Sequence, residues 1–321
     1  MRVALFFLAV LVSGVAAAQE YPAKPIRLVI PFGPGSLADA VPRLIQPALE
    51  ASLGQRLVIE HRPGAGGNVG AQAVLAAPPD GYTLMMAATN NLVINQYVFR
   101  DMKFDPLADL QPVALVAEVP LILQTHPSVP AASLREFIAH ARANPGKLNY
   151  GSPSTATLPH LAMEIFARAA GLQLVHVPFK GGAPAMNALI ANDVQAMLIG
   201  YATTAGQVKS GQVRPIAVAS DKRLAALPQV PTFGEAGFPE LQAAVPGNWW
   251  GMVGPRGMPQ PVVQRLARDI AAALGDPATR RKYEELGLTP VGSSPEAFAA
   301  ALPAQARKWE AVLRAMGSVT N

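Results

Sequence analysis

Cysteine is absent from the 321 residues of this sequence. Its absence excludes disulfide bonds, thiolate metal sites, a cysteine nucleophile and an N-terminal lipid-modified cysteine. Charged residues are also scarce, at 15% of the sequence, which is below the ~25% usual in globular proteins and excludes a disordered, highly charged chain. The net charge is only +5, and no charged run is longer than residues 280–282. We therefore expect no nucleic-acid partner.

Long apolar runs are missing except at the N-terminus. Arg2 precedes the apolar residues 3–12, and three alanines follow at 16–18. A basic start, a short apolar stretch and an A-x-A site predict a secretory signal peptide over residues 1–18, with cleavage after Ala18. The apolar stretch is too short to be a membrane anchor, because crossing the hydrocarbon core takes about 20 residues. We therefore expect a soluble, exported protein.

Beyond the N-terminus, short apolar stretches alternate with helical patterns. In the first half, predicted strands and helices follow one another at residues 26–32, 38–53, 56–60, 71–77 and 82–88. Pro42 and Pro47 are expected to break the first of these helices. The alternation restarts with a helix at 133–143, where Ser133 and Glu136 fit a capping box, and continues at residues 147–151, 159–170, 174–178, 183–191, 196–200, 203–209 and 214–219. This rhythm predicts an α/β fold with largely parallel sheets covered by helices.

The remaining segments suggest how two lobes are connected. Residues 113–124 are expected to form an extended passage from one lobe to the other, and residues 249–253 a strand that returns to the first half. The stretch at 224–246 is rich in proline and glycine and is predicted to be irregular, and helices are predicted at 260–274 and 295–316. Two α/β lobes joined by extended crossings enclose a cleft, which is a common place for a ligand.

Enzyme signatures are mostly missing. The glycine-rich residues 64–70 follow a predicted strand and open a helix, as a dinucleotide-binding loop does. Arg62 and Pro63 separate these glycines from the strand, however, and the next strand ends without an acidic residue for the ribose, so a tight structural turn is favoured. His160 and Glu164 could share a helix face, a pairing that forms surface or capping contacts more commonly than a metal site. The sequence has no G-x-S-x-G motif, which argues against an α/β-hydrolase, and we expect no cofactor and no metal.

Four turns at which a predicted strand ends and a helix begins are rich in small and hydroxyl residues. They lie at residues 32–39, 88–90, 151–157 and 179–183. In an open parallel sheet such turns gather at the carboxyl ends of the strands, where ligands bind. The first N–H groups of a helix have no partner within it and form the positive end of its dipole, so they can hold a carboxylate without a buried cation. Plain N-capping is the better explanation for any single turn, but such turns in both lobes favour a shared anion site.

Motifs along essentially the whole mature sequence resemble those of one family. They are residues 21–27 (YPAKPIR), 31–35 (PFGPG), 62–70 (RPGAGGNVG), 79–84 (PDGYTL), 176–181 (HVPFKG), 227–232 (LPQVPT), 235–237 (EAG) and 250–251 (WG). In order and spacing they are similar to the tripartite tricarboxylate transporter receptors, also called Bug receptors. The resemblance implies a periplasmic binding protein of type II, in which two α/β lobes close about a hinge on a small carboxylate. Such receptors deliver their solute to the subunits of a membrane permease and are not enzymes.

The resemblance also implies which residues bind the ligand. In that family the first strand–helix loop and a serine- and glycine-rich loop of the second lobe hold carboxylate groups, often through ordered water. Together with neighbours in the same turns and Tyr201, the candidate ligand-binding residues are Phe32, Gly35, Ser36, Leu37, Asp39, Thr89, Asn90, Ser152, Ser154, Thr155, Thr157, His160, Lys180, Gly181 and Tyr201. Lobe one is expected to comprise residues 19–122 and 247–321, and lobe two residues 123–246. We expect a monomer.

The sequence departs from the family pattern at three positions. Ser36 stands where the family usually has a second glycine, and Ser154 and Ala156 replace two glycines of the second-lobe loop. Side chains at these positions narrow the space near the ligand and restrict positive φ, so an unusual ligand or a different binding mode would follow. Asp39 would repel a nearby carboxylate; it either caps its helix or accepts from water or from an amino or hydroxyl group of the ligand.

Two other functions remain open on the sequence alone. The liganded protein could dock on a sensor protein and act in signalling, because transport and signalling would both use the closed form. An enzyme that acts on a small acid through Ser152 or His160 is the third hypothesis.

Overall fold

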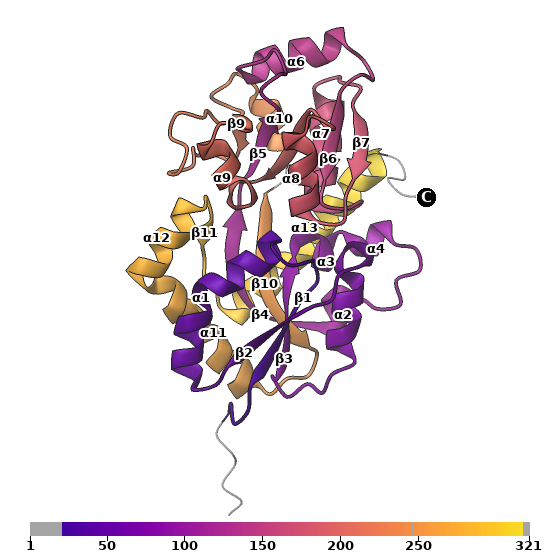
Figure 1. Cartoon of the computed structure of the whole chain (residues 1–321). Coiled ribbons are helices and arrows are strands. Elements are labelled where there is room, and N and C mark those ends of the chain that lie inside the picture. The colour runs from indigo at the N-terminus through magenta and orange to yellow at the C-terminus, as the bar shows by residue number, and fades with distance from the viewer. Residues whose placement is uncertain (1–20, 246, 317–321) are drawn as a thin grey trace, which may run out of the picture.

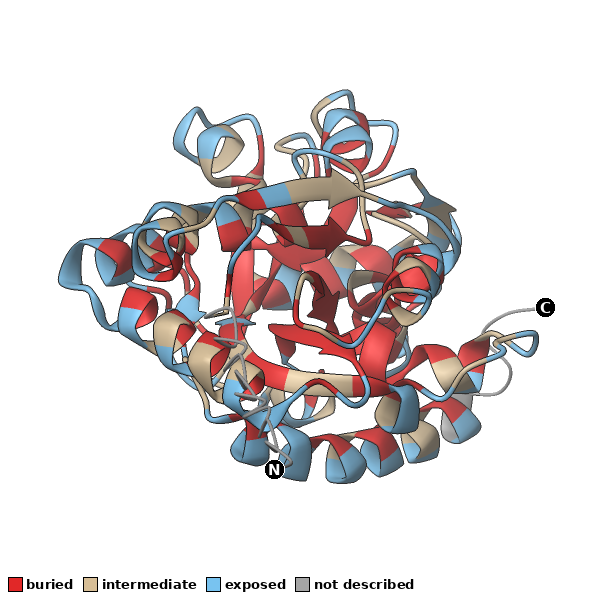
Figure 2. Cartoon of the chain, turned by 90° about the horizontal axis from the view of Figure 1, so that it is seen from below, coloured by how far each residue is buried: buried red, intermediate tan, exposed pale blue. Residues whose placement is uncertain are grey.

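Two α/β lobes, each built around its own sheet, form the part of the chain that the computed structural model describes, residues 21–245 and 247–316 (Figure 1). The predicted signal peptide lies outside these residues. Within them, no helix is both long and apolar enough to cross a membrane. Figure 2 shows buried strands at the centre of the molecule, surrounded by helices whose outer faces are exposed. The predicted α/β fold is confirmed.

The sheet of lobe one has six strands, which are β1 (Ile26–Ile30), β2 (Leu57–His61), β3 (Thr83–Ala88), β4 (Leu110–Val119), β10 (Asn248–Pro255) and β11 (Thr289–Pro290). Their order across the sheet is β11-β4-β10-β3-β1-β2. β1 pairs in parallel with β2 and β3, whereas β10 runs antiparallel to both β3 and β4. β10 is the predicted strand that returns to the first half of the chain, and it makes the sheet mixed.

Helices cover both faces of this sheet. α1 (Leu37–Leu53) and α11 (Gln260–Gly275) pack on the face to which Leu28 of β1 points, whereas α2 (Asn68–Leu75) and α13 (Pro295–Met316) pack on the face of Val29. This division follows from the alternation of side chains along a strand. The other helical segments of lobe one are the 3-10 turn η1 (Ala65–Gly67), α3 (Thr89–Val93), α4 (Asn95–Val98), α5 (Pro106–Asp109) and α12 (Pro277–Glu285).

α1 is a continuous helix, so the predicted break at Pro42 and Pro47 is wrong. Each proline lacks the N–H that would bond to the carbonyl four residues earlier. The helix forms nevertheless because Val41 and Ile45 on its apolar side are buried in the core of lobe one. The Tyr283 hydroxyl of α12 also donates to the carbonyl of Val41 at 2.7 Å. Tertiary packing therefore outweighs the two missing hydrogen bonds.

The sheet of lobe two has five strands, which are β5 (Leu121–Thr125), β6 (Asn149–Ser152), β7 (Val175–Pro178), β8 (Ala196–Gly200) and β9 (Arg214–Ala219). Their order is β7-β6-β8-β5-β9; β6 is parallel to β7 and β8, and β5 is antiparallel to β8 and β9. Ser133 caps the first helix of this lobe, because the Ser133 hydroxyl accepts from Glu136 N at 3.2 Å. The predicted capping box is not complete, since the Glu136 carboxylate accepts from Ala132 N at 2.6 Å and not from Ser133 N. The helical segments are α6 (Leu134–Ala143), α7 (Leu158–Ala169), α8 (Gly182–Ile190), η2 (Tyr201–Thr203), α9 (Ala205–Lys209) and α10 (Pro239–Ala244).

Two passages of the chain connect the lobes. Pro120 alone separates β4 of lobe one from β5 of lobe two, and the chain returns between α10 and β10. All of β5 pairs with strands of the second sheet. One hydrophobic core also extends through both lobes, and it includes Phe298 of α13 in lobe one as well as Leu123 and Phe166 in lobe two. Residues at or just after the carboxyl ends of β1 and β3 in lobe one and of β6 and β8 in lobe two line one space, so these strand ends face each other.

Candidate binding site

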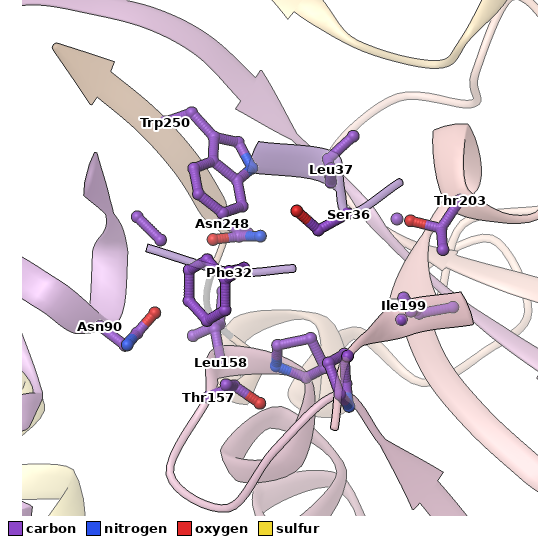
Figure 3. A pocket seen from close by; sticks show the side chains of 16 residues that line it. Phe32, Ser36, Leu37, Asn90, Thr157, Leu158, Ile199, Thr203, Asn248 and Trp250 are labelled. Carbon is purple, nitrogen blue, oxygen red and sulfur yellow. The ribbon is translucent and has the colours of Figure 1, made fainter. Parts of the chain in front are cut away.

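A cavity of about 60 Å³ lies between the two lobes (Figure 3). Lobe one contributes the start of α1, the end of β3, the start of α3 and β10, and lobe two contributes the starts of α7 and α8, the end of β8 and η2. The volume is several times the ~10–15 Å³ that one water molecule needs. The lining residues are Phe32, Ser36, Leu37, Ala88, Asn90, Pro153, Thr157, Leu158, Pro159, Gly181, Gly182, Ile199, Gly200, Thr203, Asn248 and Trp250.

Three helices begin at this cavity. Leu37, Leu158 and Gly182 are the first residues of α1, α7 and α8, and each lines the cavity. The N-cap residues of these helices form no side-chain cap hydrogen bond; they are Ser36, Thr157 and Gly181. Because the first N–H groups of a helix have no partner within it, the positive ends of three helix dipoles are open to one space. Plain N-capping therefore does not account for Ser36 and Thr157.

The cavity wall has no charged side chain, but two of its polar atoms lack a hydrogen-bond partner. None of the sixteen lining residues, which all belong to the described part of the chain, has a charged side chain. Two polar atoms of the lining residues, Ser36 Oγ and Trp250 Nε1, are buried without a hydrogen-bond partner. Trp250 is 5% exposed, and Phe32 meets its ring edge-on, with centroids 5.8 Å apart at 85°. Buried donors are almost always paired in native proteins, so these two groups are free to bond to a ligand.

Thr89 positions the first residue of β10. Its hydroxyl donates to Asn248 Oδ1 at 3.2 Å and accepts from Trp249 N at 3.0 Å. With its oxygen held in this way, Asn248 turns its Nδ2 toward Ser36, as Figure 3 shows. The side chain of Trp249 bonds elsewhere, since its Nε1 donates to Gln305 Oε1 at 2.6 Å. Adjacent tryptophans on β10 thus have different surroundings, and Trp250 is the one that lines the cavity.

Asn90 is held by the glycine-rich turn that precedes α2. Its Nδ2 donates to Gly66 O at 2.7 Å and to Asn95 Oδ1 at 3.2 Å, and its oxygen faces the cavity (Figure 3). The amides of Asn91 and Asn95 donate to the same carbonyl at 2.8 and 3.2 Å. Three asparagines therefore fix the turn at residues 64–70, which acts as a structural turn, as favoured above over a dinucleotide-binding loop.

The structure brings six of the sequence-predicted residues into the cavity wall, namely Phe32, Ser36, Leu37, Asn90, Thr157 and Gly181. The other nine do not line it: Gly35, Asp39, Thr89, Ser152, Ser154, Thr155, His160, Lys180 and Tyr201. Lys180 is exposed and Thr155 is half-buried. Tyr201 is buried in a separate apolar cluster with Ile122 and Val218, and burial raises the pKa of its hydroxyl.

Asp39 supports the first loop instead of lining the cavity. Its carboxylate accepts from Gly35 N at 3.3 Å, from Arg43 Nε at 3.0 Å and from His61 Nε2 at 3.0 Å. Gly35 has a φ of +72°, a conformation that glycine adopts without steric cost. With these partners Asp39 supports the first loop, a role that differs from the helix cap and from the acceptor for water or ligand expected of it. Ser36 itself has extended backbone, with a φ of −71° and a ψ of 162°.

The second-lobe loop, residues 151–157, is held together by internal hydrogen bonds. The carbonyl of Ser154 accepts from Ser152 Oγ at 3.0 Å and from Thr157 Oγ1 at 2.7 Å. Ala156 has a φ of +62°, and its N–H donates to Nδ1 of His160 at 3.1 Å. Ala156 therefore keeps the left-handed backbone that a glycine would adopt more easily.

Two stacked imidazoles lie behind this loop. The rings of His160 and His176 are 3.9 Å apart. Burial, and to a smaller extent His176, lowers the pKa of His160 to about 3, and burial lowers the pKa of His176 to about 4. Nε2 of His176 lies 2.7 Å from Ser152 Oγ. Ser152 is fully buried, so a substrate has no access to it, and the arrangement gives no support to a catalytic Ser152 or His160.

Glu164 and His160 do not form a shared metal site. Glu164 accepts from the Tyr150 hydroxyl, whereas His160 accepts from the backbone of the loop. Within residues 21–245 and 247–316, no group of three His, Cys, Asp or Glu side chains could hold a metal ion.

Several cavity residues that lie on or beside strands were not predicted from the sequence, above all Asn248 and Trp250. Every residue of β10 is buried, so alternating polarity does not reveal which of its side chains face the cavity. The WG motif at residues 250–251 contributed to the family resemblance but carried no expected role. The order of the strands, which places β10 next to β3, was needed to find them.

Known proteins are similar to this chain in sequence and in fold. Residues 41–318 match the family model described as tripartite tricarboxylate transporter family receptor. BugT of Bordetella pertussis is 32% identical over 310 residues, which cover 95% of this chain and 94% of BugT. The structure of Rpa4515 of R. palustris with adipate matches at a TM-score of 0.89 and 33% identity, covering 93% of this chain and 99% of Rpa4515. The structure of MatC from Rhodopseudomonas palustris with bound malate matches at 0.84 and 29%, covering 91% of this chain and 100% of MatC. The chain belongs to the tripartite tricarboxylate transporter receptor family.

Proposed function

We propose that this protein is a periplasmic receptor that captures a small carboxylate between its lobes and delivers it to a membrane permease. The observation that carries the proposal is the meeting of three uncapped helix N-termini, from both lobes, in one cavity without a charged side chain. Backbone N–H groups and helix dipoles favour an anion there. The predicted signal peptide supports export, and a monomer is sufficient because both walls of the site come from one chain.

The relatives support a carboxylate ligand. Rpa4515 and MatC match 93% and 91% of this chain, and their structures hold adipate and malate. Both compounds are dicarboxylates, and a cavity with helix starts in each lobe offers one place for each carboxylate. We therefore favour a dicarboxylate among small organic acids.

Neutral donors are sufficient for useful affinity. A hydrogen bond to a charged group is worth about 1.5–3 kcal/mol. Four to six such bonds cover the ~8 kcal/mol of a micromolar complex after the costs of ordering. The ligand then bridges the two lobes, so binding stabilises their closed arrangement, and the permease would bind that arrangement.

Calorimetric titration of the mature protein with adipate and malate tests the proposal, with adipamide as the uncharged control of the same length. We expect saturable binding of at least one acid, no binding of adipamide, and a higher melting temperature with the acid, because a ligand that binds only the folded state stabilises it. A folded sample that gives neither heat nor a thermal shift with these acids, succinate, aspartate or benzoate would contradict it.

A further inference from the structure

Three polar groups of lobe one converge on one part of the cavity. Ser36 Oγ comes from the start of α1, and Trp250 Nε1 and Asn248 Nδ2 come from β10. In Figure 3 the nitrogens of Trp250 and Asn248 and the oxygen of Ser36 point toward one another. They are not bonded to each other, because Ser36 Oγ and Trp250 Nε1 have no hydrogen-bond partner. The space between them is therefore left for an atom that the protein does not supply.

We propose that Ser36, Asn248 and Trp250 form a donor cluster that binds one carboxylate of the ligand. The proposal rests on the proposed function and specifies the lobe-one half of its site. An indole N–H and an amide NH₂ can only donate, and a serine hydroxyl can donate or accept. The cluster therefore selects an acceptor group with negative charge, and an amide or an ester at that end of the ligand is a poorer partner.

The donor cluster is held in place by its surroundings. Trp250 lies between β3 and β4 in the sheet, opposite Ala88 and Ala117, and Phe32 supports its ring edge-on. Asn248 cannot present its oxygen to the cavity without losing the hydrogen bond from Thr89. Donors that are fixed before binding need not be ordered by the ligand, which favours affinity.

The unpaired donors also lower the stability of the ligand-free protein. A buried donor without a partner destabilises the ligand-free protein, and a phenylalanine at position 250 would avoid that penalty. Trp249 provides the contrast on the same strand, because its Nε1 is paired with Gln305. The two side chains therefore have separable roles that one matched pair of substitutions can test.

The experiment compares Trp250→Phe with Trp249→Phe by titration with adipate and malate and by melting without ligand. For Trp250→Phe we expect Kd to rise about tenfold or more, as for the loss of a hydrogen bond to a charged group. The ligand-free melting temperature should not fall, because the gain from removing the unpaired donor offsets the loss of ring packing. For Trp249→Phe we expect the reverse, a lower melting temperature and a Kd near the wild-type value. Ser36→Ala, which removes a second donor with little change in volume, is expected to raise Kd as well.

Two results would overturn the donor cluster. If Trp250→Phe and Ser36→Ala both bind the acids with the wild-type Kd, the cluster does not hold the carboxylate, although the protein remains a carboxylate receptor. If the wild type binds none of the acids, the proposed function fails and the donor cluster fails with it. The wild-type titration thus distinguishes the two failures.

Discussion

At the scale of single residues, the loop of lobe two depends on histidines that stay neutral. Nδ1 of His160 can accept from Ala156 only without its own proton. The pKa values of about 3 for His160 and about 4 for His176 lie below the ordinary value of 6.5. Between these lowered pKa values and 6.5, the unfolded chain therefore binds more protons than the folded one. In this pH range the free energy of unfolding rises with pH. Tyr150, stacked on His176 and bonded to Glu164, faces the same pair.

We expect the free energy of unfolding to be highest above pH 6.5 and to fall as the pH drops toward 4. The slope is up to about 1.4 kcal/mol per pH unit for each imidazole that takes up a proton. Urea unfolding from pH 7 to pH 4 measures it. His176→Gln should make the slope shallower, whereas His140→Gln, on α6 and away from the site, should leave the slope as it is. Equal slopes in the wild type and in His176→Gln would rule out this role of the pair.

Residue types predicted part of the site. Ser36, Asn90 and Thr157 were found because small and polar residues at strand–helix turns can face a ligand. The same types also serve the loops themselves, and the sequence could not show that Asp39 supports its own loop or that Ser152 bonds to His176. Which polar atoms are left without a partner is decided only when the whole chain has folded.

At the scale of the elements, the glycine-rich turn before α2 shows how a loop is fixed by the elements around it. Gly67 has a φ of +95°. A Cβ at this position would lie 2.3 Å from Nδ2 of Asn91, which is itself bonded to Gly66 O. The turn therefore needs glycine at position 67 for its backbone conformation and for the space that Asn91 occupies. It also contacts Asn90, which lines the cavity.

Gly67→Ala is expected to lower the free energy of unfolding by about 2–4 kcal/mol, because the left-handed backbone and the overpacking of Asn91 each contribute. Gly54→Ala is the matched control: its φ is +66° and a Cβ there meets nothing within 4 Å, so only the backbone cost of about 1–2 kcal/mol applies. Chemical denaturation of both variants measures the difference. Equal losses would mean that the asparagines adapt to the methyl group and do not fix the turn.

Helices and strands with a clear apolar pattern were predicted well, whereas those with mostly polar sequences were not. The strands β8 and β9 have the predicted bounds, because their apolar runs are short and clearly bordered. α12 was missed because its sequence is mostly polar and Tyr283 is its one large buried side chain. The short helix α3 follows β3 directly, and α4 follows α3 after one residue. Both are held by the asparagine contacts around Gly66, which no local pattern reveals.

At the scale of the whole molecule, the approach of the two lobes depends on a residue without a side chain. Gly200 ends β8 in lobe two, and a Cβ there would lie 2.7 Å from Cγ1 of Val119 and 3.2 Å from Cδ2 of Leu37. Both of these residues belong to lobe one. Val119 is β-branched and buried, so it has little freedom to move aside.

Gly200→Ala is therefore expected to push the lobes apart and to raise Kd for the bound acid about tenfold, from an overpacking cost of about 1–3 kcal/mol. Gly206→Ala is the control in the same lobe, because a Cβ there meets nothing within 4 Å. Calorimetry gives the affinities, and small-angle scattering without ligand should show a larger radius of gyration for Gly200→Ala. An unchanged Kd would show that the close approach of Gly200 to Val119 and Leu37 is not needed to hold the ligand.

The two-lobe plan itself was visible in the sequence, since the alternation of strands and helices stops and restarts around an extended segment. Pro120 marks the passage between the sheets, close to the expected boundary at residue 122. How closely the lobes approach each other could not be predicted, because it is set by contacts such as that of Gly200 with Leu37, which are far apart in the sequence.

The neighbouring tryptophans of β10 also make the protein its own optical reporter. The sequence has three tryptophans, and Trp250 is the one that lines the cavity, whereas Trp249 and Trp309 line a hollow of about 810 Å³ elsewhere between the lobes. At ligand concentrations that saturate each variant, ligand-induced changes in tryptophan emission that vanish in Trp250→Phe would report on the cavity. Those that vanish in Trp249→Phe would report on the relative movement of the lobes. Capture of the solute and closure of the receptor could thus be timed separately by fluorescence, without any attached dye.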